Sequence, residues 1–189
     1  LVSSGFAGNN STFGNEIVFS KLYERTSVSL GQFHYQSDGF RTNNDQNHDI
    51  LNAFIQHAVS PKLNIQAEVR TRNTDQGNLL LDFDRDSNNP FLPKNRLRRA
   101  LDENVARVGA RYSLAPNQHI LMSGQYLDKK EKQLTFFNSK DTVTFTRNEG
   151  YQAEIQYQLR SENFNLLAGS GIHRIDAQEK SLTNSFITK

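Results

Sequence analysis

The stretch DILNAFIQHAVSPKLNIQAEVRTR, residues 49–72, alternates apolar and polar side chains on both sides of a short turn. Successive side chains of a β-strand point to opposite faces, so strict alternation predicts a strand with one apolar and one polar face. Residues 63–72 show this pattern clearly, and residues 49–59 show it more loosely. Between them Ser60-Pro61-Lys62 favours a turn, where the missing proline donor costs no ladder hydrogen bond. The stretch therefore predicts an antiparallel hairpin.

The register of this hairpin follows from its two faces. Setting Val59 opposite Leu63 makes one face uniformly apolar and the other uniformly polar. The remaining pairs are Ile55 with Ala67 and Ala53 with Val69 on the apolar face, and Gln56 with Gln66 and Asn52 with Arg70 on the polar face.

The composition is unlike that of an ordinary soluble core. Of the 189 residues only 35% are hydrophobic, and the mean hydropathy is -0.69. The 13 Phe, the 6 Tyr and the ordered alternation do not fit a disordered chain. A net charge of +2 gives no global reason to expect a nucleic-acid partner. The absence of cysteine excludes disulfides and thiolate metal sites.

The chain divides into three parts. Residues 1–14 are rich in Gly, Ser and Asn and are expected to form an irregular lead-in; residues 15–175 are expected to form the β-sheet, and residues 176–189 a tail or the start of another loop. The first residues have neither the basic start nor the apolar block of a signal peptide, so we expect an excised or processed piece. Nowhere does the sequence approach the roughly 20 apolar residues of a membrane-spanning helix.

Further alternating segments repeat the hairpin. Strands are predicted at 15–23, 27–37, 105–114, 119–128, 150–160 and 164–174. A bulge near Gly31 would reconcile the two faces of residues 27–37, and Leu114 is expected opposite Ile120. Short connections at 24–26, 60–62, 115–118 and 161–162 alternate with long ones at 38–48, 73–104 and 129–149. The sequence therefore predicts an all-β, antiparallel up-and-down meander of about eight strands.

A transmembrane β-barrel explains these regularities together. It requires strands of about 9–11 residues with an apolar outside and a polar inside, and short periplasmic turns opposite long extracellular loops. Aromatic residues are expected in two belts on the outside: Tyr126 and Tyr151 lie toward the long loops, and Tyr112, Tyr157 and Phe164 toward the short turns. A soluble β-sheet is the alternative, because tyrosine favours strands in general.

The barrel hypothesis assigns each strand residue to lipid or to the lumen. The residues expected to face lipid are Leu51, Ile55, Ile65, Val69, Val108, Tyr112, Met122, Tyr126, Tyr151, Ile155, Tyr157 and Phe164. Those expected to face the lumen are Asn52, Gln66, Glu68, Arg70, Arg107, Arg111, Gln152, Glu154 and Gln156. The charges of this second group either line a water-filled passage or neutralise one another in a ladder of ion pairs.

The long loop at 73–104 holds two charged clusters. Asp82, Asp84, Asp86 and Asn88 have the spacing of a calcium loop, although Ser87 and Pro93 replace the Gly and Glu that an EF-hand needs; a solvated acidic loop is the alternative. The basic residues Lys94, Arg96, Arg98 and Arg99 either bind anions such as lipopolysaccharide phosphates or balance nearby acids. Nothing in the sequence groups Ser, His and Asp as a catalytic site or indicates a cofactor.

Several segments resemble a known family. The residues FHYQSDGFRTNNDQNHDILNAFIQHAVSPKLNIQAEVRTRNTDQGNLLLDFD (33–84), GYQAEIQYQL (150–159) and FNLLAGSG (164–171) are similar to barrels related to TonB-dependent receptors of Gram-negative outer membranes. In particular they resemble the receptor-like barrels that follow tetratricopeptide repeats. The likeness runs over about Gln32 to Gly171, without a recognisable plug domain or a terminal strand that ends in Phe or Trp. It implies a partial barrel in the outer membrane.

These features lead to three functional hypotheses. The first is an outer-membrane barrel segment, receptor-like or porin-like, that passes or takes up an unknown solute or polymer. The second is a non-transporting barrel that anchors or assembles a periplasmic or surface module, and the third is a soluble secreted β-sheet binding module. For a barrel, the expected partners are outer-membrane lipid, lipopolysaccharide and the rest of the barrel or the periplasmic domains of a longer chain. No enzymatic role is expected.

Overall fold

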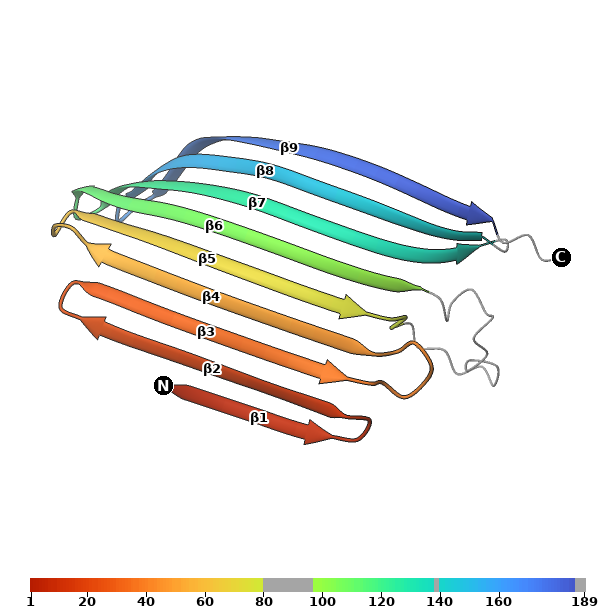
Figure 1. The fold of residues 1–189 in the computed structure, drawn as a ribbon. Helices are drawn as coiled ribbons and strands as arrows, with labels where there is room; N and C mark the ends of the chain where they lie inside the picture. The colour runs from red at the N-terminus through yellow and green to blue at the C-terminus, as the bar shows by residue number, and fades with distance from the viewer. Residues whose placement is uncertain (80–96, 138–139, 186–189) are drawn as a thin grey trace.

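The structure is a computed structural model that describes residues 1–79, 97–137 and 140–185. These residues form one antiparallel sheet of nine strands in the order β1-β2-β3-β4-β5-β6-β7-β8-β9 (Figure 1). The strands are β1 (Val2–Gly8), β2 (Thr12–Tyr23), β3 (Thr26–Ser37), β4 (Gln46–Ala58), β5 (Leu63–Gln76), β6 (Arg98–Ala115), β7 (Gln118–Phe137), β8 (Lys140–Arg160) and β9 (Asn165–Ser185). The predicted all-β meander is confirmed, with nine strands in place of about eight.

Each strand pairs with the next one along the chain, so the sheet is a single bent layer (Figure 1). The described residues include no α-helix that could cover either face. None of their segments forms a helix long and apolar enough to cross a membrane. Within the described ranges neither face of the sheet is covered by another element.

The hairpin β4–β5 has the predicted register. Ala53 pairs with Val69, Ile55 with Ala67, Asn52 with Arg70, and Gln56 with Gln66. Because cross-strand partners point to the same side of a sheet, these pairs define an apolar face and a polar face, and the two names are kept below. The register of the later strands continues both faces from β5 to β9.

Burial is concentrated on the polar face. Leu101 and Val105, the two hydrophobic residues that are buried in the described part of the chain, point to that face because they share the parity of Arg107 on β6. On the apolar face large side chains stay exposed, for example Val108 at 61% and Ile155 at 50%. A soluble monomer rarely exposes so large a continuous apolar surface, whereas a barrel wall in lipid does so by design.

Both ends of the sheet extend beyond the predicted boundaries. The expected irregular lead-in contains strand β1, and the expected tail contains the last part of β9. Asn10 and Ser11 both have positive φ in the turn that follows β1, as a tight hairpin turn requires. The Gly, Ser and Asn composition that indicated an irregular segment instead belongs to a hairpin with small side chains.

The predicted long loop at 129–149 is wrong. Strand β7 continues to Phe137 and β8 begins at Lys140, so the two form a hairpin of about twenty residues per strand. The register is unbroken from Gln118↔Leu159 to Phe137↔Lys140. Apolar residues such as Leu134, Val143 and Phe145 are few in this extension and lie among polar and charged side chains, so hydrophobic alternation was too weak to predict the strands there. The loop predicted at 73–104 is also shorter than expected, because β5 continues to Gln76 and β6 begins at Arg98. The added strand residues are mostly polar or charged, so hydrophobic alternation is weak there as well.

Two predicted details of pairing are also wrong. Strands β2 and β3 pair without a register shift at Gly31, so there is no bulge there, and Phe33 and Tyr35 lie on the polar face. Tyr112, not Leu114, lies opposite Ile120, because an irregularity between Ser113 and Ala115 shifts the register at the turn. The observed partner of Ile120 differs from the predicted one by two residues, so the apolar face is preserved.

Candidate functional site

The predicted lumen-facing residues all lie on the polar face. Their positions follow from the pairing of β4 with β5, β5 with β6, β6 with β7, and β7 with β8. The residues are Asn52, Gln66, Glu68, Arg70, Arg107, Arg111, Gln152, Glu154 and Gln156. The register brings them to one side of the sheet. That this side is a lumen stays a prediction.

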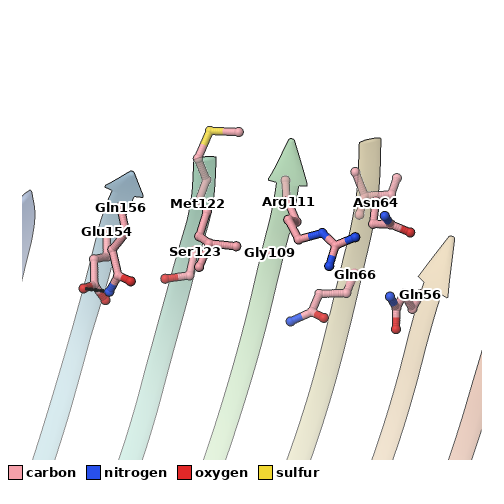
Figure 2. A pocket seen from close by; sticks show the side chains of 12 residues that line it. Gln56, Asn64, Gln66, Gly109, Arg111, Met122, Ser123, Glu154 and Gln156 are labelled. Atoms are coloured by element: carbon pink, nitrogen blue, oxygen red, sulfur yellow. Dashed lines mark hydrogen bonds between the residues drawn. The ribbon is translucent and has the colours of Figure 1, made fainter. Parts of the chain in front are cut away.

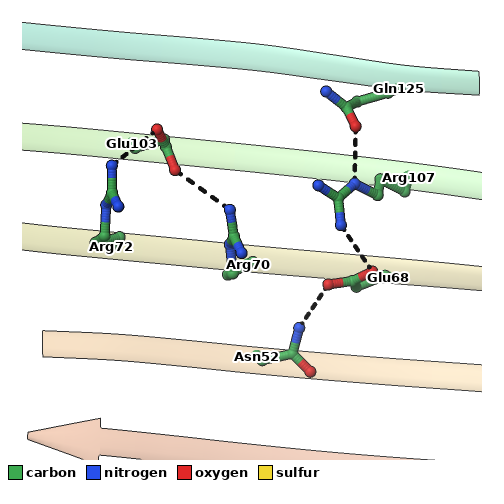
Figure 3. A network of polar contacts seen from close by, with 7 residues as sticks. All are labelled: Asn52, Glu68, Arg70, Arg72, Glu103, Arg107 and Gln125. Atoms are coloured by element: carbon green, nitrogen blue, oxygen red, sulfur yellow. Dashed lines mark hydrogen bonds and ion pairs between the residues drawn. The ribbon is translucent and has the colours of Figure 1, made fainter.

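Glu68 is the centre of the first polar network on this face. Asn52 Nδ2 donates to one of its carboxylate oxygens at 2.8 Å, and Arg107 Nη1 lies 3.3 Å from the other. Arg107 also donates from Nε to Gln125 Oε1 at 2.8 Å, so the network crosses strands β4 to β7 (Figure 3). Glu68 and Arg107 are direct cross-strand partners. The ladder of ion pairs is therefore formed at this level of the sheet.

Glu103 is the centre of a second network, which the alternating pattern of the sequence did not predict. Arg70 Nη2 and Arg72 Nη2 lie 3.4 Å and 3.1 Å from its two carboxylate oxygens (Figure 3). The Glu103 side chain is only 13% exposed, while the two arginines are about one-third exposed. Arg72 and Glu103 were not predicted to face the lumen because Arg72 is the last residue of its predicted strand and Glu103 lies outside the predicted strands. Arg72 lies two residues from Arg70, and Glu103 lies four residues from Arg107. Residues an even number apart on a strand share a face, so this spacing could have indicated their position.

An amide-rich hollow of 460 Å³ lies on the polar face toward the short turns. Its polar lining includes Gln56, Asn64, Gln66, Arg111, Ser123, Glu154 and Gln156 (Figure 2). Gln156 Nε2 donates to Glu154 Oε1 at 2.5 Å. Among the described residues neither Arg111 nor Glu154 forms an ion pair. This hollow can therefore offer both charges and several amides to a polar solute.

Gly109 shapes the floor of this hollow. A Cβ at this position would lie 3.0 Å from Gln66 Nε2, so the Gln66 side chain lies across the glycine on the neighbouring strand. Any larger residue would push Gln66 outward. The glycine thus sets how far the amide reaches from the wall.

A third charged group lies toward the long loops. Arg99 Nε lies 2.6 Å from Glu131 Oε1, and Lys129 Nζ lies 3.5 Å from Glu131 Oε2. The hydrogen bond from Arg99 holds the pKa of the Glu131 carboxyl below its usual range, and the same bond raises the pKa of Arg99. Asp102 and Lys130 occupy the opposite face at this height, so the pair lies beyond the apolar band.

The long-loop end is tied together by buried polar groups. Arg41 Nη2 and Asn44 Nδ2 each donate to the carbonyl oxygen of Asn78 at 2.8 Å. Asn78 is fully buried, and its N–H donates to the carbonyl of Asn43 at 2.6 Å. Hydrogen bonds that are this well satisfied fix the segment before β4 against the segment after β5. These residues fall in predicted loops, where sequence patterns give no pairing information.

The charged clusters of the long loop are only partly described. The calcium candidates Asp82, Asp84, Asp86 and Asn88 lie outside the described residues, as do Lys94 and Arg96. Arg98 pairs with Asp45 and Asp75, and Arg99 with Glu131. These two arginines therefore balance nearby acids. Within the described ranges no group of three or more His, Cys, Asp and Glu side chains is placed to hold a metal ion.

The predicted lipid-facing residues share the apolar face, with one exception. The eleven that do so are Leu51, Ile55, Ile65, Val69, Val108, Tyr112, Met122, Tyr126, Tyr151, Ile155 and Tyr157. Phe164 lies in the turn before β9 and is 56% exposed. Tyr126 pairs directly with Tyr151, and Tyr112 and Tyr157 flank Ile120. Tyrosines thus cluster at two separate heights, as two aromatic belts require.

The sheet is similar to part of two solved structures. It superposes on the ferric citrate transporter FecA in its unliganded form with a TM-score of 0.77 and 10% identity, over 97% of this chain and 29% of that chain. It superposes on the siderophore receptor PiuA from Acinetobacter baumannii with a TM-score of 0.71 and 10% identity, over 94% and 30% of the two chains. No family model matches the sequence, and no curated protein does.

These likenesses concern the fold. The chain spans less than a third of the length of either structure. Both are TonB-dependent receptors, so the predicted resemblance to a partial barrel of that kind is confirmed at the level of the fold. They also agree with the predicted location in the outer membrane of a Gram-negative-type cell. The architecture of this chain is that of a segment of the sheet seen in these two structures.

Proposed function

We propose that the chain forms part of the wall of an outer-membrane barrel through which a solute or polymer passes or is taken up. The observation that carries this proposal is the division of one uncovered sheet into an apolar face and a polar, ion-paired face. Lipid on one side and water on the other satisfy both faces at once. A soluble sheet would need a second layer over the apolar face.

The free sheet edges support the same reading. Within the described residues β1 and β9 pair on one side only. Unpaired backbone N–H and C=O groups are not tolerated in the hydrocarbon region, so a membrane barrel needs further strands to close it. The similar structures are more than three times as long as the region they share with this chain. We propose that additional strands complete the wall.

Passage of solutes is tested with the full chain in liposomes. The proposal predicts that protein-containing liposomes release an entrapped small polar dye, or swell in an isosmotic sugar, faster than protein-free liposomes. A barrel that is sealed to every solute, with and without an energy source, would refute passage. Extraction of the chain into buffer without detergent, as a soluble monomer, would refute the membrane assignment itself.

One alternative has a specific observation in its favour. The ion pairs of Glu68 with Arg107 and of Glu103 with Arg70 and Arg72 neutralise much of the charge on the polar face. Such a wall also suits a closed barrel that anchors a periplasmic or surface module. A sealed barrel that co-purifies with such a module would favour this alternative. The similar structures are a transporter and a receptor, which favours a non-enzymatic role in either case.

A further inference from the structure

The charges on strands β5 to β7 are distributed unequally between the two faces. On the polar face these strands carry six cations and three carboxylates: Arg70, Arg72, Arg99, Arg107, Arg111 and Lys129 against Glu68, Glu103 and Glu131. On the opposite face the same strands carry three of each: Arg98, Lys130 and Lys132 against Asp75, Asp102 and Asp128. On these three strands the polar face is therefore cationic, and the other face is neutral.

The excess positive charge is greatest around Glu103. Arg70 and Arg72 lie two residues apart on one strand, so their side chains are about 7 Å apart along the same face. Both form their ion pair with Glu103, and each of the two carboxylate oxygens of Glu103 contacts one of the arginines. Lys129 is the cross-strand partner of Glu103 on the other side. Arg70 and Arg72 thus share one carboxylate, and the third cation, Lys129, lies next to Glu103 in the register while its Nζ pairs with Glu131.

The hydrogen-bonding capacity of these arginines is far from saturated. The Nε atoms of Arg70 and Arg72 are buried without a hydrogen-bond partner among the described residues. Each guanidinium uses only Nη2 toward Glu103, so Nη1 has no partner in the described part of the chain. With about one-third of each side chain exposed, these Nη1 groups can reach a solute at the wall. A guanidinium offers a planar fork that fits carboxylate and phosphate groups.

The surroundings strengthen the attraction for an anion. Val105, which is 6% exposed, lies directly opposite Arg70, and Leu101 follows on the same face at 7%. Apolar neighbours lower the local dielectric constant, so charges interact more strongly there than in bulk water. Because Arg70 and Arg72 share a single carboxylate, one positive charge of the two is left uncompensated there, which is costly. A bound anion would relieve that cost.

We infer that Arg70 and Arg72, with Lys129 beside them, form a binding site for a polyanionic solute that carries carboxylate or phosphate groups. The site deepens the proposed function, because it defines the chemical class of solute that the polar face accepts. It lies nearer the long loops than the amide-rich hollow does. A solute that enters from the long-loop side meets the arginines first and the amides of Gln66 and Gln156 afterwards.

The inference is tested by direct binding to the full chain in detergent micelles at low salt, measured by titration calorimetry. Tricarballylate represents polycarboxylates, inorganic pyrophosphate represents phosphates, and glucose is the neutral control. We expect at least one of the two anions to bind and glucose not to bind. The affinity should fall as sodium chloride is added, since the interaction is electrostatic. If neither anion binds, the inference is overturned.

Variants separate a binding role from a structural one. The double variant Arg70→Gln/Arg72→Gln should lose at least tenfold in anion affinity, whereas Arg98→Gln, which removes an arginine from the other face, should not change it. Glu103→Gln should raise the affinity several-fold, because it removes the competing carboxylate. If the glutamine variants fail to fold, Arg70→Lys/Arg72→Lys keeps the charges without the fork and should weaken binding partially. Unchanged affinity in the arginine variants, or weaker binding in folded Glu103→Gln, contradicts the inference.

The binding result is independent of the passage result. A barrel that releases entrapped dye but binds neither anion overturns the polyanion site and leaves the proposed function standing. A barrel that binds an anion through Arg70 and Arg72 but passes no solute supports the site and refutes passage.

Discussion

A lysine placed on the apolar face of β5 tests the membrane assignment most directly. Val69 lies six residues beyond Leu63, the first residue of the strand. With a rise of about 3.3 Å per residue and a strand tilt of about 45°, Val69 lies about 14 Å from Leu63 along the membrane normal. The apolar band of a barrel is about 25 Å tall, so Val69 lies near its middle and Ile65, about 5 Å from Leu63, near its edge.

The expected cost follows from these depths. A lysine near the midplane destabilises a barrel by about 2–4 kcal/mol, and one near the interface by about 0–1 kcal/mol. We therefore expect Val69→Lys to lower the free energy of unfolding from lipid by about 2–4 kcal/mol, and Ile65→Lys, about 5 Å inside the edge, to lower it by an intermediate amount of about 1–2 kcal/mol. Gln66→Lys is the matched control, because Gln66 points to the polar face and lines the 460 Å³ hollow. It should change stability by less than about 0.5 kcal/mol.

The assay is equilibrium unfolding of the full chain in phospholipid vesicles with guanidinium chloride, followed by circular dichroism of the strands. The loss at Val69 corresponds to a change of about 30- to 1000-fold in the folding equilibrium, which shifts the transition measurably. A loss of stability that is largest for Val69→Lys, smaller for Ile65→Lys and smallest for Gln66→Lys supports the depth assignment. Equal tolerance of lysine at Ile65 and Gln66 would overturn the assignment of the two faces.

Two further predictions concern the long-loop end. The Glu131 carboxyl has a lowered pKa because Arg99 donates to it, so its stabilising contribution is present above the ordinary value of 4.5 and is lost as the pH falls below that value. The difference in unfolding free energy between the wild type and Glu131→Gln should therefore shrink in acid below about pH 4.5, and a difference that is constant from pH 7 to pH 3 would contradict this. Gly77→Ala should destabilise the fold by about 1–3 kcal/mol, because its Cβ would lie 2.2 Å from the carbonyl oxygen of Asn43. Gly124→Ala, whose Cβ would meet Val108 at 3.4 Å, should unfold within about 1 kcal/mol of the wild type; equal midpoints for both alanine variants would refute the close contact at Gly77.

The ion pairs on the polar face were only partly predictable. The alternating pattern of the sequence predicts Glu68, Arg70 and Arg107 on one face, and they lie there. It could not assign partners, because the pairing of β5 with β6 bridges a segment of more than twenty residues that carries no register signal. Arg70 in fact bonds Glu103, its diagonal neighbour, and Glu68 bonds Arg107. Long side chains reach across the diagonal, so their choice depends on the register and twist of the assembled sheet.

By itself, the sequence determined that this chain forms antiparallel strands with an apolar and a polar face, and it determined the register of the β4–β5 hairpin. That was possible because alternation is a local pattern: each residue reports the solvent on its own side, and a turn as short as Ser60-Pro61-Lys62 permits one pairing of the faces. Only the tertiary structure decided how far β7 and β8 extend, how Asn78 ties the long-loop end together, and which carboxylate Arg70 and Arg72 share. Toward the long loops polar and charged residues predominate on both faces of β7 and β8, so hydrophobic spacing carries little information there, and contacts between distant strands select the arrangement.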